Sequence, residues 1–161
     1  MYKLDKEVTS SATDKISNTE LYTLLKNKFG YRFNINIPIL NIPLKFGGIP
    51  IYLSDGDYDL PSDKDVKSFV DSDPTSNEVY GERRHSGDME DFDCDDFAYM
   101  LMGNSCKENS SWAFGIIWTE AHAFCIYVNN LKRIMFVEPQ SDKILDYIES
   151  WQGKSPRFIV M

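Results

Sequence analysis

The chain has 161 residues, a net charge of −8, and 42% hydrophobic residues that include ten Phe, nine Tyr and three Trp. This composition predicts a single domain over residues 1–161 with a full apolar core, and it excludes an intrinsically disordered chain. The acidic balance also argues against a nucleic-acid partner, because such a protein normally carries a basic surface that faces phosphate.

Residues 1–16 are polar and are expected to be flexible. They hold no apolar segment of the signal-peptide type, and no apolar run approaches the ~20 residues of a membrane span. The three cysteines, Cys94, Cys106 and Cys125, form no Cys-x-x-Cys pair. An odd cysteine count without a secretion signal predicts free thiols and a cytoplasmic protein with no membrane partner. Scattered Cys and His also lack zinc-site spacing, so we expect neither metal nor other cofactor.

The first helix is predicted after Ser17, because Ser17 and Glu20 have the spacing of a capping box. Gly30 can end this helix after about three turns. The leucines that would face the core follow at helical spacing, at positions 21, 24 and 25.

Prolines at positions 38, 43 and 50 exclude a long helix or a central strand over residues 31–53. We expect an extended segment that wraps the core, with edge strands at 32–37 and 50–53.

The next stretch, Asp55 to Asp63, has carboxylates at several positions of an EF-hand calcium loop. Leu60 replaces the glycine of the sharp turn, and Val66 replaces the bidentate glutamate, so an acidic surface loop is the better interpretation. Ser62 then caps a short predicted helix that stops before Pro74.

The second half predicts a helix over 93–103, followed by strands over 112–118, 122–128, 133–137 and 158–160. This order indicates an α+β fold in which one helix packs on a small antiparallel sheet.

Asp93-Cys94-Asp95-Asp96-Phe97-Ala98 is the most informative motif. Asp93 can cap the helix and leave Cys94 in its first turn, where backbone N–H groups and the helix dipole favour a thiolate. The same N–H groups could later hold an oxyanion.

A nucleophilic thiol needs a base and a group that orients the base, and His122 and Glu138 are the candidates. A hairpin over the turn 129–131 would pair Val128 with Lys132 and bring His122 opposite Glu138. Cross-strand partners lie close enough for an imidazole–carboxylate hydrogen bond. A register shifted by one residue would move Glu138 to the other face, so the triad hypothesis depends on this turn.

These motifs resemble those of the transglutaminase-like and papain-like cysteine hydrolase superfamily. The similarity covers residues 92–140, from the Cys-Asp-Asp-Phe-Ala motif through His122-Ala123 to Glu138-Pro139-Gln140. The chain resembles small bacterial and phage-type proteins that carry these motifs in the same order. The resemblance implies a papain-like or transglutaminase-like fold, with residues 92–140 as the catalytic-type core and Cys94, His122 and Glu138 as the catalytic triad.

Two features separate the chain from that family. The third triad residue is Glu rather than the usual Asp, and the short Cys-to-His interval leaves little room for a substrate-binding insertion. Six carboxylates also crowd the nucleophile, and nearby negative charge raises a thiol pKa. They lie at positions 88, 90, 91, 93, 95 and 96.

We therefore expect a cysteine hydrolase or acyltransferase that acts on an amide-type bond of a protein or of a small amide or amine substrate. Candidate substrate contacts are Trp112, Asp93 and Gln140, and the acidic rim suits a cationic group. The alternative is a catalytically inactive binding protein on the same fold, since folds are reused without chemistry. A weaker alternative is a divalent cation held by Asp93, Asp95, Asp96 and His122.

The other thiols and the second histidine have plainer interpretations. Cys125 alternates to the strand face away from His122 and is expected to be buried. Cys106 is expected in a loop, where it could serve as a resolving thiol for Cys94 or simply lie at the surface. His85 is expected in a charged loop.

Overall fold

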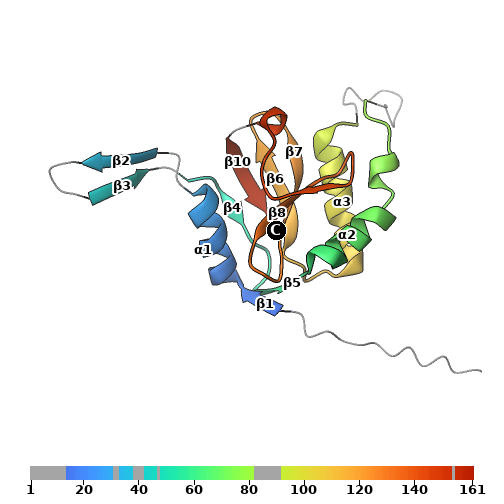
Figure 1. Ribbon diagram of the computed structural model, residues 1–161, viewed down its shortest axis with the longest axis horizontal. Helices are drawn as coiled ribbons and strands as arrows, with labels where there is room; N and C mark the ends of the chain where they lie inside the picture. The colour runs from blue at the N-terminus through green and yellow to red at the C-terminus, as the bar shows by residue number, and fades with distance from the viewer. Residues whose placement is uncertain (1–13, 31–32, 38–41, 47, 82–91, 154) are drawn as a thin grey trace, which may run out of the picture.

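The computed structural model describes residues 14–30, 33–37, 42–46, 48–81, 92–153 and 155–161. Its centre is a six-stranded sheet with the strand order β4-β10-β6-β7-β8-β9. Helix α1 packs on one face of this sheet, and helices α2 and α3 pack on the other (Figure 1). The α+β class predicted from the sequence is therefore confirmed, with helices packed on a mixed sheet.

The central sheet is mostly antiparallel. β6, β7 and β8 form a meander, and β10 pairs with the outer side of β6. The sequence did not predict the parallel pairing of β4 with β10 at one edge or the antiparallel pairing of β9 with β8 at the other. The strands span Ile51–Tyr52 (β4), Phe114–Thr119 (β6), Ala123–Val128 (β7), Ile134–Glu138 (β8), Lys143–Leu145 (β9) and Pro156–Val160 (β10).

The helices begin where the sequence places their caps. The Ser17 hydroxyl accepts from the Glu20 amide at the start of α1 (Asn18–Phe29), and Gly30 ends that helix. Ser62 and Asp65 form a reciprocal capping box at the start of α2 (Asp63–Ser72). Helix α3 (Cys94–Glu108) continues past the predicted end at residue 103. None of the described helices is long and apolar enough to cross a membrane.

Two predictions for the N-terminal half are wrong. Residues 14–16 are not flexible, because they belong to β1 (Asp14–Ser17), which pairs with β5 (Asp57–Leu60) and buries Ile16. The same pairing replaces the expected acidic loop, since Tyr58 and Leu60 point into the core from β5. Residues 1–13 lie outside the described part of the chain.

The proline-containing segment forms a hairpin of β2 (Phe33–Ile37) and β3 (Ile42–Phe46), separate from the central sheet (Figure 1). Strands are present near both expected ranges, 32–37 and 50–53, as β2 and β4. Only β4 lies at an edge of the central sheet, because β2 pairs with β3, which the sequence did not predict. Two short 3-10 helices complete the described elements, η1 (Thr75–Asn77) and η2 (Ser150–Gln152).

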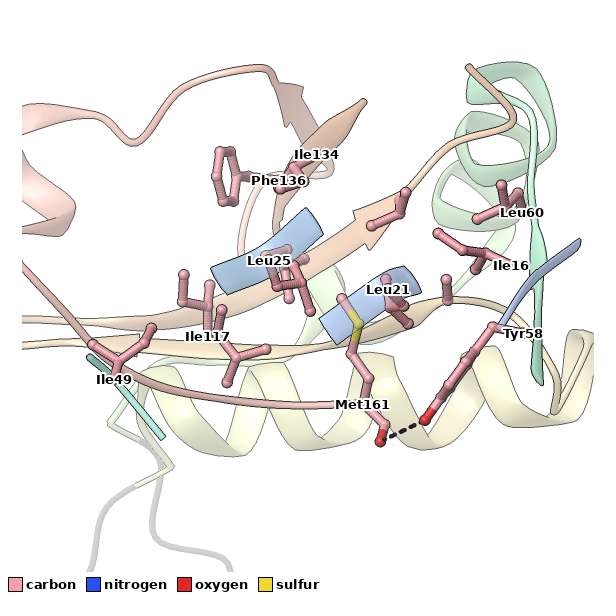
Figure 2. Packing of buried hydrophobic residues seen from close by; sticks show 14 of the residues in the cluster. Ile16, Leu21, Leu25, Ile49, Tyr58, Leu60, Ile117, Ile134, Phe136 and Met161 are labelled. Carbon is pink, nitrogen blue, oxygen red and sulfur yellow. Dashed lines mark hydrogen bonds between the residues drawn. The ribbon is translucent and has the colours of Figure 1, made fainter. Parts of the chain in front are cut away.

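The hydrophobic core has one cluster on each face of the sheet. On the first face, Leu21 and Leu25 of α1 pack against apolar residues of β7, β8 and β10 (Figure 2). On that face Tyr58 also donates from its hydroxyl to the carbonyl of Met161, which ties β5 to the end of the chain (Figure 2). On the second face, α2 and α3 cover the alternate residues of β7 and β8, together with residues of β6.

The β7–β8 hairpin has a different register from the one predicted. Val128 pairs with Ile134 rather than Lys132, and the Asn129 amide donates to the Arg133 carbonyl. The three-residue loop is thus 130–132, one position later than expected, and Lys132 adopts φ 55° as such loops require. A one-position shift of the loop moves the pairing by two residues, which preserves the faces. His122 and Glu138 therefore remain on one face, although they are not direct cross-strand partners.

Candidate active site

Cys94 is the first residue of α3, as the sequence predicted. Asp93 is the N-cap, and its carboxylate accepts from the Asp95 amide at 3.2 Å. The Asp96 carboxylate accepts from the Asp93 amide at 3.0 Å and completes a reciprocal capping box. Two acidic side chains thus fix the start of the helix and hold the half-buried Cys94 thiol at its N-terminal turn.

The surroundings of Cys94 act on its thiol in opposite directions. Partial burial raises the pKa of the Cys94 thiol, and the charges of Asp93 and Asp95 raise it further. The backbone amides of Ala123 and of Cys94 itself oppose this increase, because each donates to the sulfur and stabilises a thiolate. The Ala123 contact also places the sulfur beside the residue that follows His122. A positive partner is needed for Cys94 to ionise near neutral pH.

Asp95 contributes to this balance in a pH-dependent way. A hydrogen bond with the Asp93 side chain, together with burial and the Asp93 charge, raises the pKa of Asp95 to about 6. Asp95 therefore carries its full negative charge beside the thiol only above that pH.

His122 and Glu138 form a buried hydrogen-bonded pair. Imidazole Nε2 lies 2.8 Å from Glu138 Oε2, with side-chain exposures of 7% and 4%. The Gln140 amide donates to the other carboxylate oxygen at 3.4 Å. Because Nε2 faces the carboxylate, Nδ1 is the ring nitrogen left for a reacting group.

Thr119 holds the turn that presents His122. Its hydroxyl accepts from the amides of Ala121 and His122 at 3.2 and 3.0 Å. The Thr119 amide in turn donates to the His122 carbonyl at 2.9 Å. The connection between β6 and β7 is thereby fixed, and His122 lies immediately before β7. The His122 ring packs against Trp151, at a centroid distance of 4.8 Å, and against Phe124, at 5.7 Å.

Cys94 and His122 line one open pocket of about 300 Å³. Two exposed aromatic rings, Tyr80 and Trp151, flank it, with exposed fractions of 62% and 54%. The predicted contact Gln140 also lines this pocket, so a substrate that enters would meet thiol, imidazole and amide side chains together. The lining residues are Tyr80, Cys94, Ala121, His122, Gln140 and Trp151.

Other predicted residues lie elsewhere or act differently. Trp112 packs edge-on against Phe69 in the core of the second sheet face. It does not line this pocket, where the substrate contact was predicted. Asp93 acts as the helix cap beside the thiol. His85 and the carboxylates at 88, 90 and 91 lie outside the described residues.

The remaining thiols do not join the site. The loop placement of Cys106 is wrong, because it lies on α3. At about 1.5 Å of rise per residue it is roughly 18 Å from Cys94 along the helix, too far for a resolving disulfide. Cys125 is fully buried on the face covered by α3, as its alternation predicted.

Only some of the residues predicted to bind a divalent cation lie close together. Asp93, Cys94 and Asp95 place one ligand atom each within 4.8 Å of one another. Asp96 and His122 do not join this group in the described part of the chain, and each has another hydrogen-bond partner.

Sequence reasoning missed three residues of this site, Gln152, Trp151 and Tyr80. Gln152 is fully buried and donates to Glu138 Oε2 at 2.8 Å. Tyr80 precedes the Cys94 motif and Trp151 follows the Glu138 motif, and neither belongs to the predicted pattern. The short sequence Trp151-Gln152-Gly153, close after the Glu138 motif, is the one signal that could have marked the first two.

A scan against models of known families and a search of curated proteins found no match. Among solved structures, the chain is similar to one described as a PSL1a–E64 complex, with a TM-score of 0.64 and 17% identity over 91% of this chain. It is also similar to the Polyporus squamosus lectin bound to the glycan Neu5Aca2-6Galb1-4GlcNAc, with a TM-score of 0.62, 17% identity and 91% coverage. This chain spans about half the length of each, 50% and 49%. At 17% identity, the likeness shows that this chain shares its α+β fold with about half of each of those chains.

Proposed function

We propose that the protein is a cysteine hydrolase or acyltransferase that acts on an amide-type bond. The observation that carries the proposal is the buried His122–Glu138 hydrogen bond at 2.8 Å, beside a pocket that His122 shares with the helix-initial thiol of Cys94. A nucleophile, a base and a group that orients the base are the three parts that thiol catalysis requires. The likeness to a chain in complex with E64 gives independent support.

In the proposed reaction, the Cys94 thiol gives its proton to His122 Nδ1, and the sulfur attacks the carbonyl carbon of the substrate. The carbonyl oxygen gains negative charge and accepts from the Cys94 amide at the helix N-terminus. The C–N bond then breaks, and the amine leaves with the proton held by His122. Water or a second amine attacks the thioester carbon and gives its proton to His122. The C–S bond then breaks, the acid or new amide is released, and His122 returns the proton to the Cys94 sulfur.

The acidic surroundings favour an amine-bearing substrate. Asp93 and Asp95 lie beside the sulfur, and the whole chain carries a charge of −8. A cationic group near the scissile bond would neutralise these carboxylates and so remove part of the charge that raises the pKa of Cys94. A protein or a small amide that carries a basic group is therefore the proposed substrate class.

The second candidate is a binding protein of the same fold without chemistry. The raised pKa of Cys94 favours it, because a thiol that stays protonated at neutral pH is a poor nucleophile. The similar Polyporus squamosus lectin, of which this chain matches 49%, is a binding protein solved with a glycan, which keeps a binding role as the alternative.

The test uses E64, an epoxide that a thiolate opens to form a covalent adduct. Intact mass and peptide mapping should find one adduct, on Cys94, in the wild-type protein and in Cys106→Ser. Cys94→Ser should form none while it keeps the wild-type melting temperature. Exposed Cys106 serves as an internal measure of an ordinary thiol. Labelling of Cys106 alone would assign the protein to the binding class.

A further inference from the structure

Gln152 forms a third contact with Glu138. It lies at the end of η2 with 0% exposure, and its side-chain Nε2 donates to Glu138 Oε2 at 2.8 Å. This is the same oxygen that faces His122 Nε2, also at 2.8 Å. One carboxylate oxygen therefore meets two nitrogens, from two different segments of the chain.

The orientation of the Gln152 amide follows from its other partner. The Glu149 backbone amide lies 2.9 Å from Gln152 Oε1 and can only donate. The side-chain oxygen must therefore face Glu149, and the NH₂ group must face Glu138. Because an NH₂ group can only donate, Glu138 Oε2 must accept from it.

This arrangement has a consequence for the imidazole. Glu138 Oε2 lies between the two nitrogens, and a carboxylate oxygen can only accept, so the hydrogen of the His122 contact lies on Nε2. In the neutral ring the other nitrogen, Nδ1, is then without a proton and can act as a base. We propose that Gln152 is a positioning residue that holds Glu138 Oε2 against His122 Nε2 and thereby keeps His122 in the Nε2–H tautomer. This inference rests on the proposed function for its effect on Cys94.

The segment that carries Gln152 is tightly fixed. The Thr119 hydroxyl, which accepts from the His122 amide, donates to the Gln152 carbonyl. Gly153 follows with φ +97°, and a Cβ at that position would come within 2.7 Å of Thr119 Oγ1. The neighbouring Trp151 packs on the His122 ring at 4.8 Å. The backbone on both sides of the His122–Glu138 pair is thus held in one arrangement.

The test compares Gln152→Met with the wild-type protein. Methionine keeps the length and packing of the side chain but removes the donor to Glu138 and the oxygen that accepts from the Glu149 amide. Two measurements are made, the tautomer of His122 from ¹⁵N NMR of the ring and the alkylation rate of Cys94 by iodoacetamide in a Cys106→Ser background. We expect Gln152→Met to populate the Nδ1–H tautomer of His122. The alkylation rate of Cys94 should decrease about tenfold, the equivalent of one pKa unit in the base.

Gln152→Glu provides the rescue. The carboxyl group that this substitution introduces can donate to Glu138 only when it is protonated. The alkylation rate of Cys94 in this variant, relative to the wild-type protein, should therefore rise as the pH falls. Asn129→Ala is the structural control, because Asn129 is also a fully buried amide but lies at the far end of the β7–β8 hairpin. It should lower stability without a change in the His122 tautomer.

The outcomes separate this inference from the proposed function. An unchanged tautomer in folded Gln152→Met overturns the role of Gln152. A decrease in Cys94 rate with the same tautomer as wild type also overturns it, because it indicates a structural role alone. If wild-type Cys94 reacts no faster than Cys106, the proposed function fails, while the NMR measurement still decides the role of Gln152.

Discussion

Asp95→Asn should lower the pKa of the Cys94 thiol. The substitution removes one negative charge whose oxygen lies within 4.8 Å of the sulfur, and it leaves the Asp93 cap in place. Since Asp95 is partly solvated, an effective dielectric of about 40 to 80 applies, and the repulsion is about 0.9–1.7 kcal/mol. That energy corresponds to a decrease of about 0.6–1.3 units in the thiol pKa.

The rate gain is smaller than the gain in thiolate, because nucleophilicity falls with thiol pKa by a Brønsted slope of about 0.4–0.5. Alkylation of Cys94 at pH 7.5 should therefore become about two- to fivefold faster. The gain should disappear below pH ~5, because Asp95 takes up a proton as the pH falls through about 6 and its charge is then already absent from the wild-type protein.

The assay is iodoacetamide alkylation followed by intact mass in a Cys106→Ser background, from pH 5 to 9. Asp57→Asn is the matched control, because Asp57 is exposed on β5, at the opposite end of the molecule from the start of α3 (Figure 1). It removes the same charge and should leave the rate unchanged. An unchanged or lower rate in Asp95→Asn, or an equal gain in both variants, would refute the electrostatic reasoning.

Two further predictions concern the hairpin that sets the position of Glu138. Asn129→Ala should lower the free energy of unfolding by about 2–4 kcal/mol in urea, because its side chain donates to Asp63 and accepts from the Leu131 and Arg133 amides. A loss below about 0.5 kcal/mol would mean that the side chain does not hold the loop. Lys132→Gly should raise the free energy of unfolding by about 0.5–1 kcal/mol, since Lys132 has φ 55° and its exposed ion pair with Glu20 contributes little. A loss of stability would contradict the left-handed conformation.

Local features of the sequence predicted much of the fold and part of the candidate site. Ser17, Ser62 and Asp93 were identified as helix caps because capping depends on residues within one turn. Alternation placed Cys125 on the face opposite His122 for a similar reason, since strand periodicity is local. The position of Cys94 at the start of α3 follows from the same kind of information.

The parts that were missed depend on distant segments. The hairpin register was wrong by two residues because the left-handed residue of the loop is a lysine, and no glycine marked the position. The β1–β5 pairing, which turned a polar terminus and an acidic loop into strands, joins segments some 40 residues apart. Gln152 reaches Glu138 through the return of the chain after β9, and no local pattern predicts such a contact.

The pH dependence of Cys94 alkylation in the wild-type protein and in His122→Ala tests the central claim most directly. A working triad predicts that the wild-type thiol reacts at a lower pH than Cys106, because a thiolate–imidazolium pair with His122 offsets the burial and the carboxylates that raise its pKa. His122→Ala should then slow Cys94 at neutral pH by about tenfold or more and move its reactivity to higher pH. Identical profiles in the two proteins would show that Cys94 and His122 do not act together.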